Sequence, residues 1–145
     1  MLLLEDAALL AAGLSRPKVA HARSLAAAFT SGVLHADRLA ALDDDAAIAA
    51  MVAVRGLGPW TAEVYLLFAL ARADVFPAGD VALGASLMAL KGLPARPSPR
   101  ALRDHALAWR PYRALAARLL WHHWRHLTGR PSFDDVTVAP AGRSA

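Results

Sequence analysis

The sequence predicts an all-α fold. Hydrophobic residues make up 57% of the chain, alanine and leucine dominate, and alternating runs of β-branched residues are almost absent. Apolar residues recur instead at helical spacing, as Val19, Ala22 and Ala26 do along one helix face. A length of 145 residues fits one domain of ordinary size with a single core.

Helix caps, glycines and prolines divide the chain into predicted helices. Ser15, Asp80 and Ser98 stand where N-caps are expected, and Gly13 and Gly129 stand where helices end. The predicted helices cover residues 2–12, 15–30, 36–42, 44–54, 59–72, 81–93, 99–109 and 111–127. Residues 1–129 are expected to form the domain, and residues 130–145 a disordered tail, because the tail is polar and contains prolines.

A tight turn joins the fourth and fifth predicted helices. Gly56 and Gly58 bracket Leu57 in a turn that glycines enter at little cost, and the fixed φ of Pro59 starts a new helix. Backbone N–H groups between Gly58 and Thr61 are then unpaired at a helix N-terminus. Such a terminus binds anions, and phosphate is the obvious candidate.

The charge of the chain is uneven. The formal net charge is +4 and the pI about 10.3, and residues 96–130 hold eight arginines against the single acid Asp104. This electropositive third suits a polyanionic partner, although arginine can also simply take the place of lysine. The absence of cysteine excludes disulfides, thiolate zinc sites, iron–sulfur clusters and cysteine nucleophiles, and is consistent with a cytoplasmic protein.

No membrane partner is expected, because the first apolar run is too short to span a bilayer and contains Glu5 and Asp6 where a signal peptide would carry bases. His122 and His126 have a spacing that can bind a metal, but no third ligand with suitable spacing is evident. We therefore expect no metal site at these histidines and no cofactor.

Asp80 is the strongest candidate for a catalytic residue. An aspartate before an apolar helix usually acts only as a cap. Here the preceding loop, Val75 to Ala78, is apolar, and the phosphate-binding turn lies one helix earlier in the chain. A carboxylate in such a place can stabilise a cationic sugar transition state or orient an attacking water.

Four ordered motifs resemble one family of proteins. They are GLSRPKVAHARSLAAAF, VRGLGPWTAEVYLLFAL, DVFPAGDVAL and WRPYRALAARLLW. From about Leu9 to Trp124 the chain resembles the helix-hairpin-helix base-excision DNA glycosylases, closest to the DNA-3-methyladenine glycosylase II branch. The resemblance implies a bundle of about seven or eight helices that binds double-stranded DNA, flips out an alkylated base and hydrolyses its N-glycosidic bond.

The resemblance also implies the site. Asp80 matches the catalytic aspartate of the family. The turn residues are expected to hold DNA phosphate, often with a monovalent cation on the turn carbonyls: Gly56, Leu57, Gly58 and Thr61. Arg113 is expected to contact either a phosphate or a core carboxylate.

Three aromatic residues are expected to line the base pocket: Trp60, Trp121 and, on the same wall as Trp60, Tyr65. Core packing is the alternative role for both tryptophans. Stacking on a cationic alkylated purine is favourable for such rings. Trp60 stands where bifunctional members of the superfamily carry a Schiff-base lysine, so the implied chemistry is monofunctional and leaves an abasic site.

The chain departs from the family pattern in two places. We expect the N-terminal segment of the family to be missing, which makes the chain an N-terminally truncated member, and Gly84 stands where the resemblance implies a long polar residue. Three classes of function stay open. The first is a glycosylase, either a short active enzyme acting at the bacterial nucleoid or part of a split enzyme whose missing helices come from another chain. The second is a noncatalytic DNA-binding module, and the third is a helical protein-interaction domain.

Overall fold

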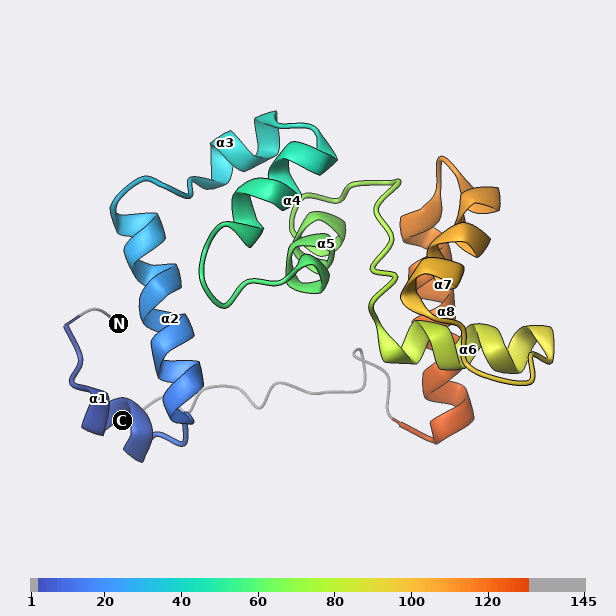
Figure 1. The fold of residues 1–145 in the computed structure, drawn as a ribbon, viewed down its shortest axis with the longest axis horizontal. Coiled ribbons are helices and arrows are strands. Elements are labelled where there is room, and N and C mark those ends of the chain that lie inside the picture. Colours follow the sequence, from blue (N-terminus) through green and yellow to red (C-terminus); the bar gives the residue numbers. More distant parts are fainter. Residues whose placement is uncertain (1–2, 131–145) are drawn as a thin grey trace, which may run out of the picture.

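The computed structural model describes residues 3–130, and this part of the chain is helical without any strand (Figure 1). The α-helices, with one 3₁₀ helix, η1, are α1 (Asp6–Ala11), α2 (Arg16–Thr30), α3 (Ala36–Ala41), α4 (Asp44–Val52), α5 (Pro59–Phe68), α6 (Val81–Lys91), α7 (Pro99–Ala106), η1 (Leu107–Trp109) and α8 (Arg113–Thr128). The prediction of an all-α fold is confirmed. The predicted tail lies almost wholly outside the described residues.

Two helices fall short of their predicted range by four residues at one end, and the bounds of the others differ by three residues or fewer. α1 begins at Asp6, because Glu5 before it has an extended backbone with ψ 147°. α5 ends at Phe68, four residues early, and Ala71 then takes a left-handed conformation with φ 51°. The chain must leave the helix axis here to reach α6, and the apolar periodicity of residues 69–72 does not reveal that turn.

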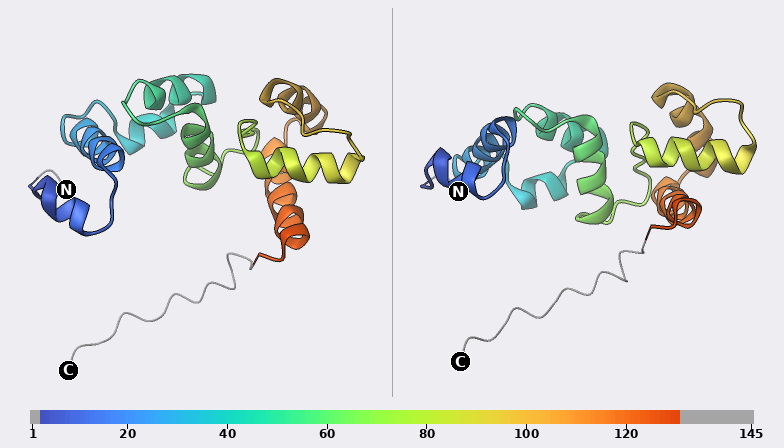
Figure 2. Two further views of the ribbon diagram at one scale, coloured as in Figure 1. Left: turned by 60° about the horizontal axis from the view of Figure 1, so that its bottom comes forward. Right: turned by 90° about the horizontal axis from the view of Figure 1, so that it is seen from below.

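The helices form two groups with separate cores (Figures 1 and 2). The N-terminal core lies among α2 to α5 and consists of Ala28, Leu34, Leu39, Ala47, Met51, Val54, Ala62, Leu66 and Val75. The C-terminal core lies among α5 to α8 and consists of Leu67, Phe76, Ala78, Leu83, Leu87, Leu102, Ala106, Ala114, Ala117 and Leu120. The single core expected from the chain length is therefore divided in two.

Adjacent residues join the two cores. Leu66 belongs to the N-terminal core and its neighbour Leu67 to the C-terminal core, and Val75 and Phe76 divide in the same way. The boundary between the cores therefore passes through α5 and the segment that leads to α6. Asp80, the residue before α6, lies at the end of this shared and buried segment.

Within the described residues, no helix is both long enough and apolar enough to span a membrane.

Candidate functional site

Asp80 is held by hydrogen bonds to both carboxylate oxygens. Oδ1 accepts from the backbone N–H of Ala82 at 2.8 Å and of Leu83 at 3.1 Å, so the side chain caps α6 as predicted. Oδ2 accepts from the indole Nε1 of Trp60 at 2.8 Å. Because a carboxylate has about four acceptor positions, Oδ2 can accept one more hydrogen bond from a water or a substrate.

Trp60 links this carboxylate to the turn between α4 and α5. It is the second residue of α5, and 48% of its surface remains exposed. The bond to Asp80 engages the N–H edge of the indole and fixes the orientation of the ring. The exposed ring is then available for stacking beside the carboxylate.

The turn presents its amides as the sequence predicts. Gly58 is the N-cap of α5, and no side chain caps this helix. Pro59 has no N–H, so Trp60 and Thr61 carry the free amides of the first turn. These groups can bind an anion next to the Trp60–Asp80 pair.

The two glycines of the turn have different roles. Gly56 has φ 96°, and a Cβ on it would lie 2.5 Å from the ring of His21. Gly58 has φ −98°, which any residue can adopt, and a Cβ there would meet open space. The expectation that both positions need glycine for the turn conformation is therefore correct only for Gly56.

His21 is a residue that sequence reasoning missed. It is exposed on α2 and lies against Gly56, so α2 supports the turn from 35 residues earlier in the chain. The first of the four motifs contains His21, but nothing in its sequence shows what the ring contacts. A pairing between distant segments of this kind has no signature in local periodicity.

The other two aromatic candidates lie apart from Trp60. Tyr65 is half-buried and packs against the N-terminal core. Trp121 packs against the C-terminal core and stacks on Phe68, with ring centroids 5.6 Å apart. Phe68 lies at the end of α5 opposite to Trp60, so the structure gives both residues packing contacts and their place in a base pocket stays a prediction.

Arg113 binds a carboxylate. Its Nε donates to Asp74 Oδ1 at 2.7 Å and its Nη2 to Oδ2 at 3.0 Å, and only 17% of its side chain is exposed. Arg110 donates to the same carboxylate at 3.0 Å. The hydrogen bonds from Arg113 first, and from Arg110, lower the pKa of Asp74 to about 2. Of the two predicted partners of Arg113, the structure shows the carboxylate, Asp74, and a contact with DNA phosphate stays a prediction.

Most arginines of the predicted electropositive region that have a described contact are paired with an acid or an aromatic ring of the same chain. The pairs are Arg103 with Glu63, Arg110 and Arg113 with Asp74, Arg118 with the Phe68 ring, and Arg130 with the Trp124 ring. Arg96 and Arg100 have no hydrogen bond, ion pair or ring contact within residues 3–130. The number of arginines that can meet a polyanion is thus smaller than the sequence suggests.

No group of three or more histidine, aspartate or glutamate side chains in the described residues could hold a metal ion. His122 and His126 are both exposed on α8. The monovalent cation at the turn carbonyls stays a prediction.

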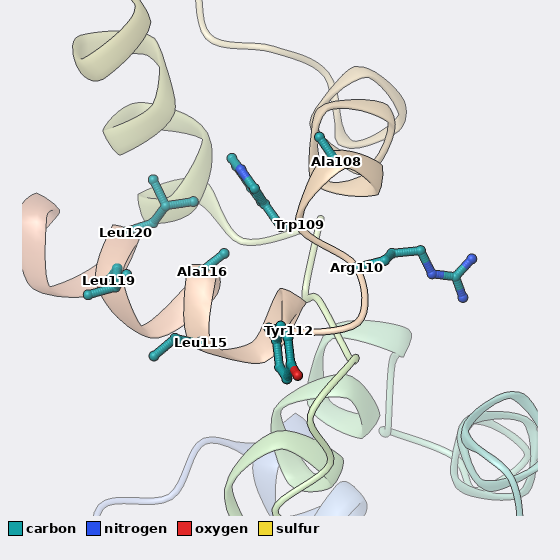
Figure 3. A pocket seen from close by; sticks show the side chains of 8 residues that line it. All are labelled: Ala108, Trp109, Arg110, Tyr112, Leu115, Ala116, Leu119 and Leu120. Carbon is teal, nitrogen blue, oxygen red and sulfur yellow. The ribbon is translucent and has the colours of Figure 1, made fainter.

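An apolar pocket of about 480 Å³ lies away from Asp80, along α8 (Figure 3). Its lining residues are Ala108, Trp109, Arg110, Tyr112, Leu115, Ala116, Leu119 and Leu120. Tyr112 is 65% exposed, and Arg110 points away from the leucines. No aspartate, glutamate, histidine or lysine lines this pocket.

Comparison with known proteins gives the site its context. No model of a known protein family matches the chain. The chain is 33% identical to DNA-3-methyladenine glycosylase 1 of Schizosaccharomyces pombe over 77% of its own length and 49% of that protein. It is 47% identical to the probable bifunctional transcriptional activator/DNA repair enzyme AlkA of Mycobacterium tuberculosis over 52% of its own length and 15% of that protein.

Two solved structures share the fold of this chain. The DNA-3-methyladenine glycosidase of Bacillus halodurans matches with a TM-score of 0.76 and 31% identity, over 88% of this chain and 58% of that one. The 3-methyladenine DNA glycosylase of S. pombe in complex with abasic DNA matches with a TM-score of 0.78 and 28% identity, over 86% and 60%.

The fold and the sequence identity therefore show a protein similar to the helix-hairpin-helix DNA glycosylases. The chain is homologous to the 3-methyladenine DNA glycosylases, and it spans about half the length of the curated yeast relative. The resemblance stated from the four motifs is confirmed.

Proposed function

We propose that this chain is a monofunctional DNA glycosylase, which hydrolyses the N-glycosidic bond of alkylated bases in duplex DNA. The proposal gives the turn of Gly56, Leu57, Gly58 and Thr61 the role of holding a phosphate, and Asp80 the catalytic role. Its place of action would be the bacterial cytoplasm, at the nucleoid.

One observation carries the proposal. A single hydrogen bond, from Trp60 Nε1 to Asp80 Oδ2, joins the anion-binding turn to the carboxylate that caps α6. A residue that served only as a cap would need no partner on a second helix. A pure DNA-binding surface would also gain nothing from a fixed anion beside its phosphate site.

The chemistry follows from this geometry. Amides of Trp60 and Thr61 hold the backbone of the damaged strand, and the everted base stacks on the exposed ring of Trp60. As the N-glycosidic bond breaks, positive charge develops on the sugar, and the Asp80 carboxylate stabilises it or orients the attacking water through the free position on Oδ2.

The absence of a nearby amine supports hydrolysis without strand cleavage. The lysines of the chain are Lys18 and Lys91. Lys18 lies in the first turn of α2, and Lys91 is the last residue of α6, at the end of the helix opposite to Asp80. A pocket that opens at Asp80, between the start of α6 and the loop before α7, is lined by neither lysine, so no Schiff base with the sugar is expected there.

The test is release of free base from methylated duplex DNA by the 145-residue chain and by its Asp80→Asn variant. The single carbonyl oxygen of asparagine can still cap α6, but its NH2 group then faces the Trp60 N–H, so thermal unfolding of the variant is measured beside base release to separate lost folding from lost chemistry. We expect release to fall by about 100-fold or more, because the carboxylate charge is lost. Asp104→Asn, which changes an exposed aspartate on α7, is the matched control and should release base as the parent does.

Each outcome decides between the candidate functions. A parent chain that binds abasic DNA but releases no base would support the noncatalytic module or the split enzyme. Equal release by the parent and by Asp80→Asn would show that Asp80 has no catalytic role. A parent that binds no DNA would overturn the proposed function as a whole.

A further inference from the structure

A second, smaller pocket opens at Asp80. It has a volume of about 230 Å³ and is formed by the start of α6 and by the loop and first turn that lead into α7. Asp80, Gly84, Arg96 and Ser98 line it, and no residue of the α4–α5 turn does. The carboxylate therefore takes part in two surfaces, one shared with Trp60 and the turn, and one shared with Arg96.

Gly84 makes room for Arg96 in this pocket. A Cβ on Gly84 would lie 3.0 Å from Arg96 Cγ and 3.2 Å from Arg96 Cδ. The stem of the arginine thus packs directly over the backbone of α6, one turn after Asp80. Because glycine has no side chain, the space over this turn of α6 is filled by an arginine from another segment.

The charged end of Arg96 is available. Arg96 is exposed and forms no hydrogen bond, ion pair or ring contact within residues 3–130, unlike Arg103, Arg110 and Arg113. Ser98, also in the pocket, uses its hydroxyl to cap α7 through the Ala101 N–H at 3.2 Å. The guanidinium is therefore the free cationic donor of this pocket.

The proposed reaction places a phosphate on each side of Asp80. A nucleotide whose sugar reacts at Asp80 carries phosphates on its 5′ and 3′ sides, and the amides of Trp60 and Thr61 can bind only one of them. The other needs a second cation or donor, because it lies near the Asp80 carboxylate and would otherwise be repelled by it.

We propose that Arg96, seated over Gly84, binds the second phosphate that flanks the everted nucleotide. This inference rests on the proposed function, since it assumes that the reacting sugar lies at Asp80. The guanidinium donates two hydrogen bonds to the phosphate oxygens and offsets the negative charge of Asp80 toward the DNA.

Fluorescence anisotropy with duplex DNA that carries a stable abasic-site analogue tests this role. We expect Arg96→Gln to weaken binding to the analogue duplex by about tenfold. The slope of log affinity against log salt concentration should fall by an amount equivalent to about one phosphate contact. Lys91→Gln, which removes one positive charge at the opposite end of α6, is the control and should leave both quantities near the parent values.

An uncharged phosphate locates the contact. A single methylphosphonate linkage is placed either 5′ or 3′ to the analogue in two further duplexes. We expect the methylphosphonate at one of the two positions to lower the DNA affinity of the parent by about tenfold. The same linkage should not lower the affinity of Arg96→Gln any further, because that variant has already lost the interaction.

The outcomes separate this inference from the proposed function. If the parent binds the analogue duplex and Arg96→Gln matches Lys91→Gln, the inference is overturned and the proposed function stands. An equal loss on undamaged duplex would show only a general charge effect, and would overturn it as well. A parent that binds neither duplex contradicts both.

Discussion

Glu63 is the buried acid of the described residues. It lies on α5 one turn after Trp60, with 8% of its surface exposed, and Arg103 of α7 approaches it to 3.8 Å. Burial raises the pKa of Glu63 from 4.5 to about 7, and the positive charge of Arg103 opposes part of that rise. The sequence shows an acid on a helix but does not show that the helix turns it inward.

This pKa makes the stability of the protein depend on pH. Because the native state binds the Glu63 proton more tightly than the unfolded chain does, the free energy of unfolding falls as the pH rises from 4.5 to about 7. The loss is on the order of 3 kcal/mol. Glu63→Gln cannot ionise, so we expect it to be more stable than the parent at pH 8 and nearly equal to it at pH 4.5.

Urea unfolding at several pH values measures the difference. Asp104→Asn, at an exposed acid, serves as the control and should shift stability by the same small amount at each pH. A stability difference for Glu63→Gln that does not grow between pH 5 and pH 7, a window taken from the shifted pKa, would show that Glu63 titrates as a surface acid.

Among the helices, local signals predicted most N-termini. Asp80 and Ser98 each accept a hydrogen bond from the first turn of the helix that follows, whereas Ser15 stands at the N-cap of α2 without such a bond. The starts predicted at residues 2 and 111 lie at Asp6 and Arg113 in the structure. The C-terminus of α5 was missed, because its end depends on where the chain must go next and not on the residues of the helix. The Trp60–Asp80 pair was also beyond prediction from spacing, since 20 residues separate its members.

The two glycines of the turn allow stability to be separated from DNA binding. Gly56→Ala places a side chain at φ 96° and against the His21 ring, so we expect a loss of about 2 kcal/mol or more in stability. Gly58→Ala keeps an ordinary φ and meets no protein atom, so its stability should change by less than about 0.5 kcal/mol. Its Cβ would instead occupy the space that a bound phosphate needs.

Thermal unfolding and anisotropy with abasic-analogue DNA measure both effects. We expect Gly58→Ala to bind DNA more weakly than the parent while melting at nearly the same temperature. His21→Ala in the Gly56→Ala background should recover part of the lost stability, because the ring is what the new Cβ meets. If Gly58→Ala binds DNA as tightly as the parent does, the turn amides do not hold a phosphate.

The arginine content of residues 96–130 indicates a positive charge but not which of these arginines can contact a partner. Sequence alone groups them all into one surface for a polyanion. The structure divides them, because Asp74 and Glu63 come from segments outside that region and bind three of its arginines, Arg103, Arg110 and Arg113. Which arginines remain free is a property of the tertiary contacts alone.

Asp74 connects the two helix groups, because it lies in the segment between α5 and α6 and binds Arg113 at the start of α8. Asp74→Asn keeps the shape of the side chain and removes its charge, which leaves the half-buried guanidinium of Arg113 without its partner. We expect a loss of about 1 to 2 kcal/mol in the free energy of unfolding near pH 7, after allowance for solvent screening.

The same ion pairs set an acid limit on stability. Because the pKa of Asp74 is lowered from 3.8 to about 2, its contribution is complete above pH 3.8 and is lost as the pH falls toward 2. Urea unfolding should therefore show a gap between parent and Asp74→Asn that is constant from pH 7 to about pH 5 and closes in strong acid. A gap that persists at pH 2 would mean that Asp74 holds α8 through its shape and not through its charge.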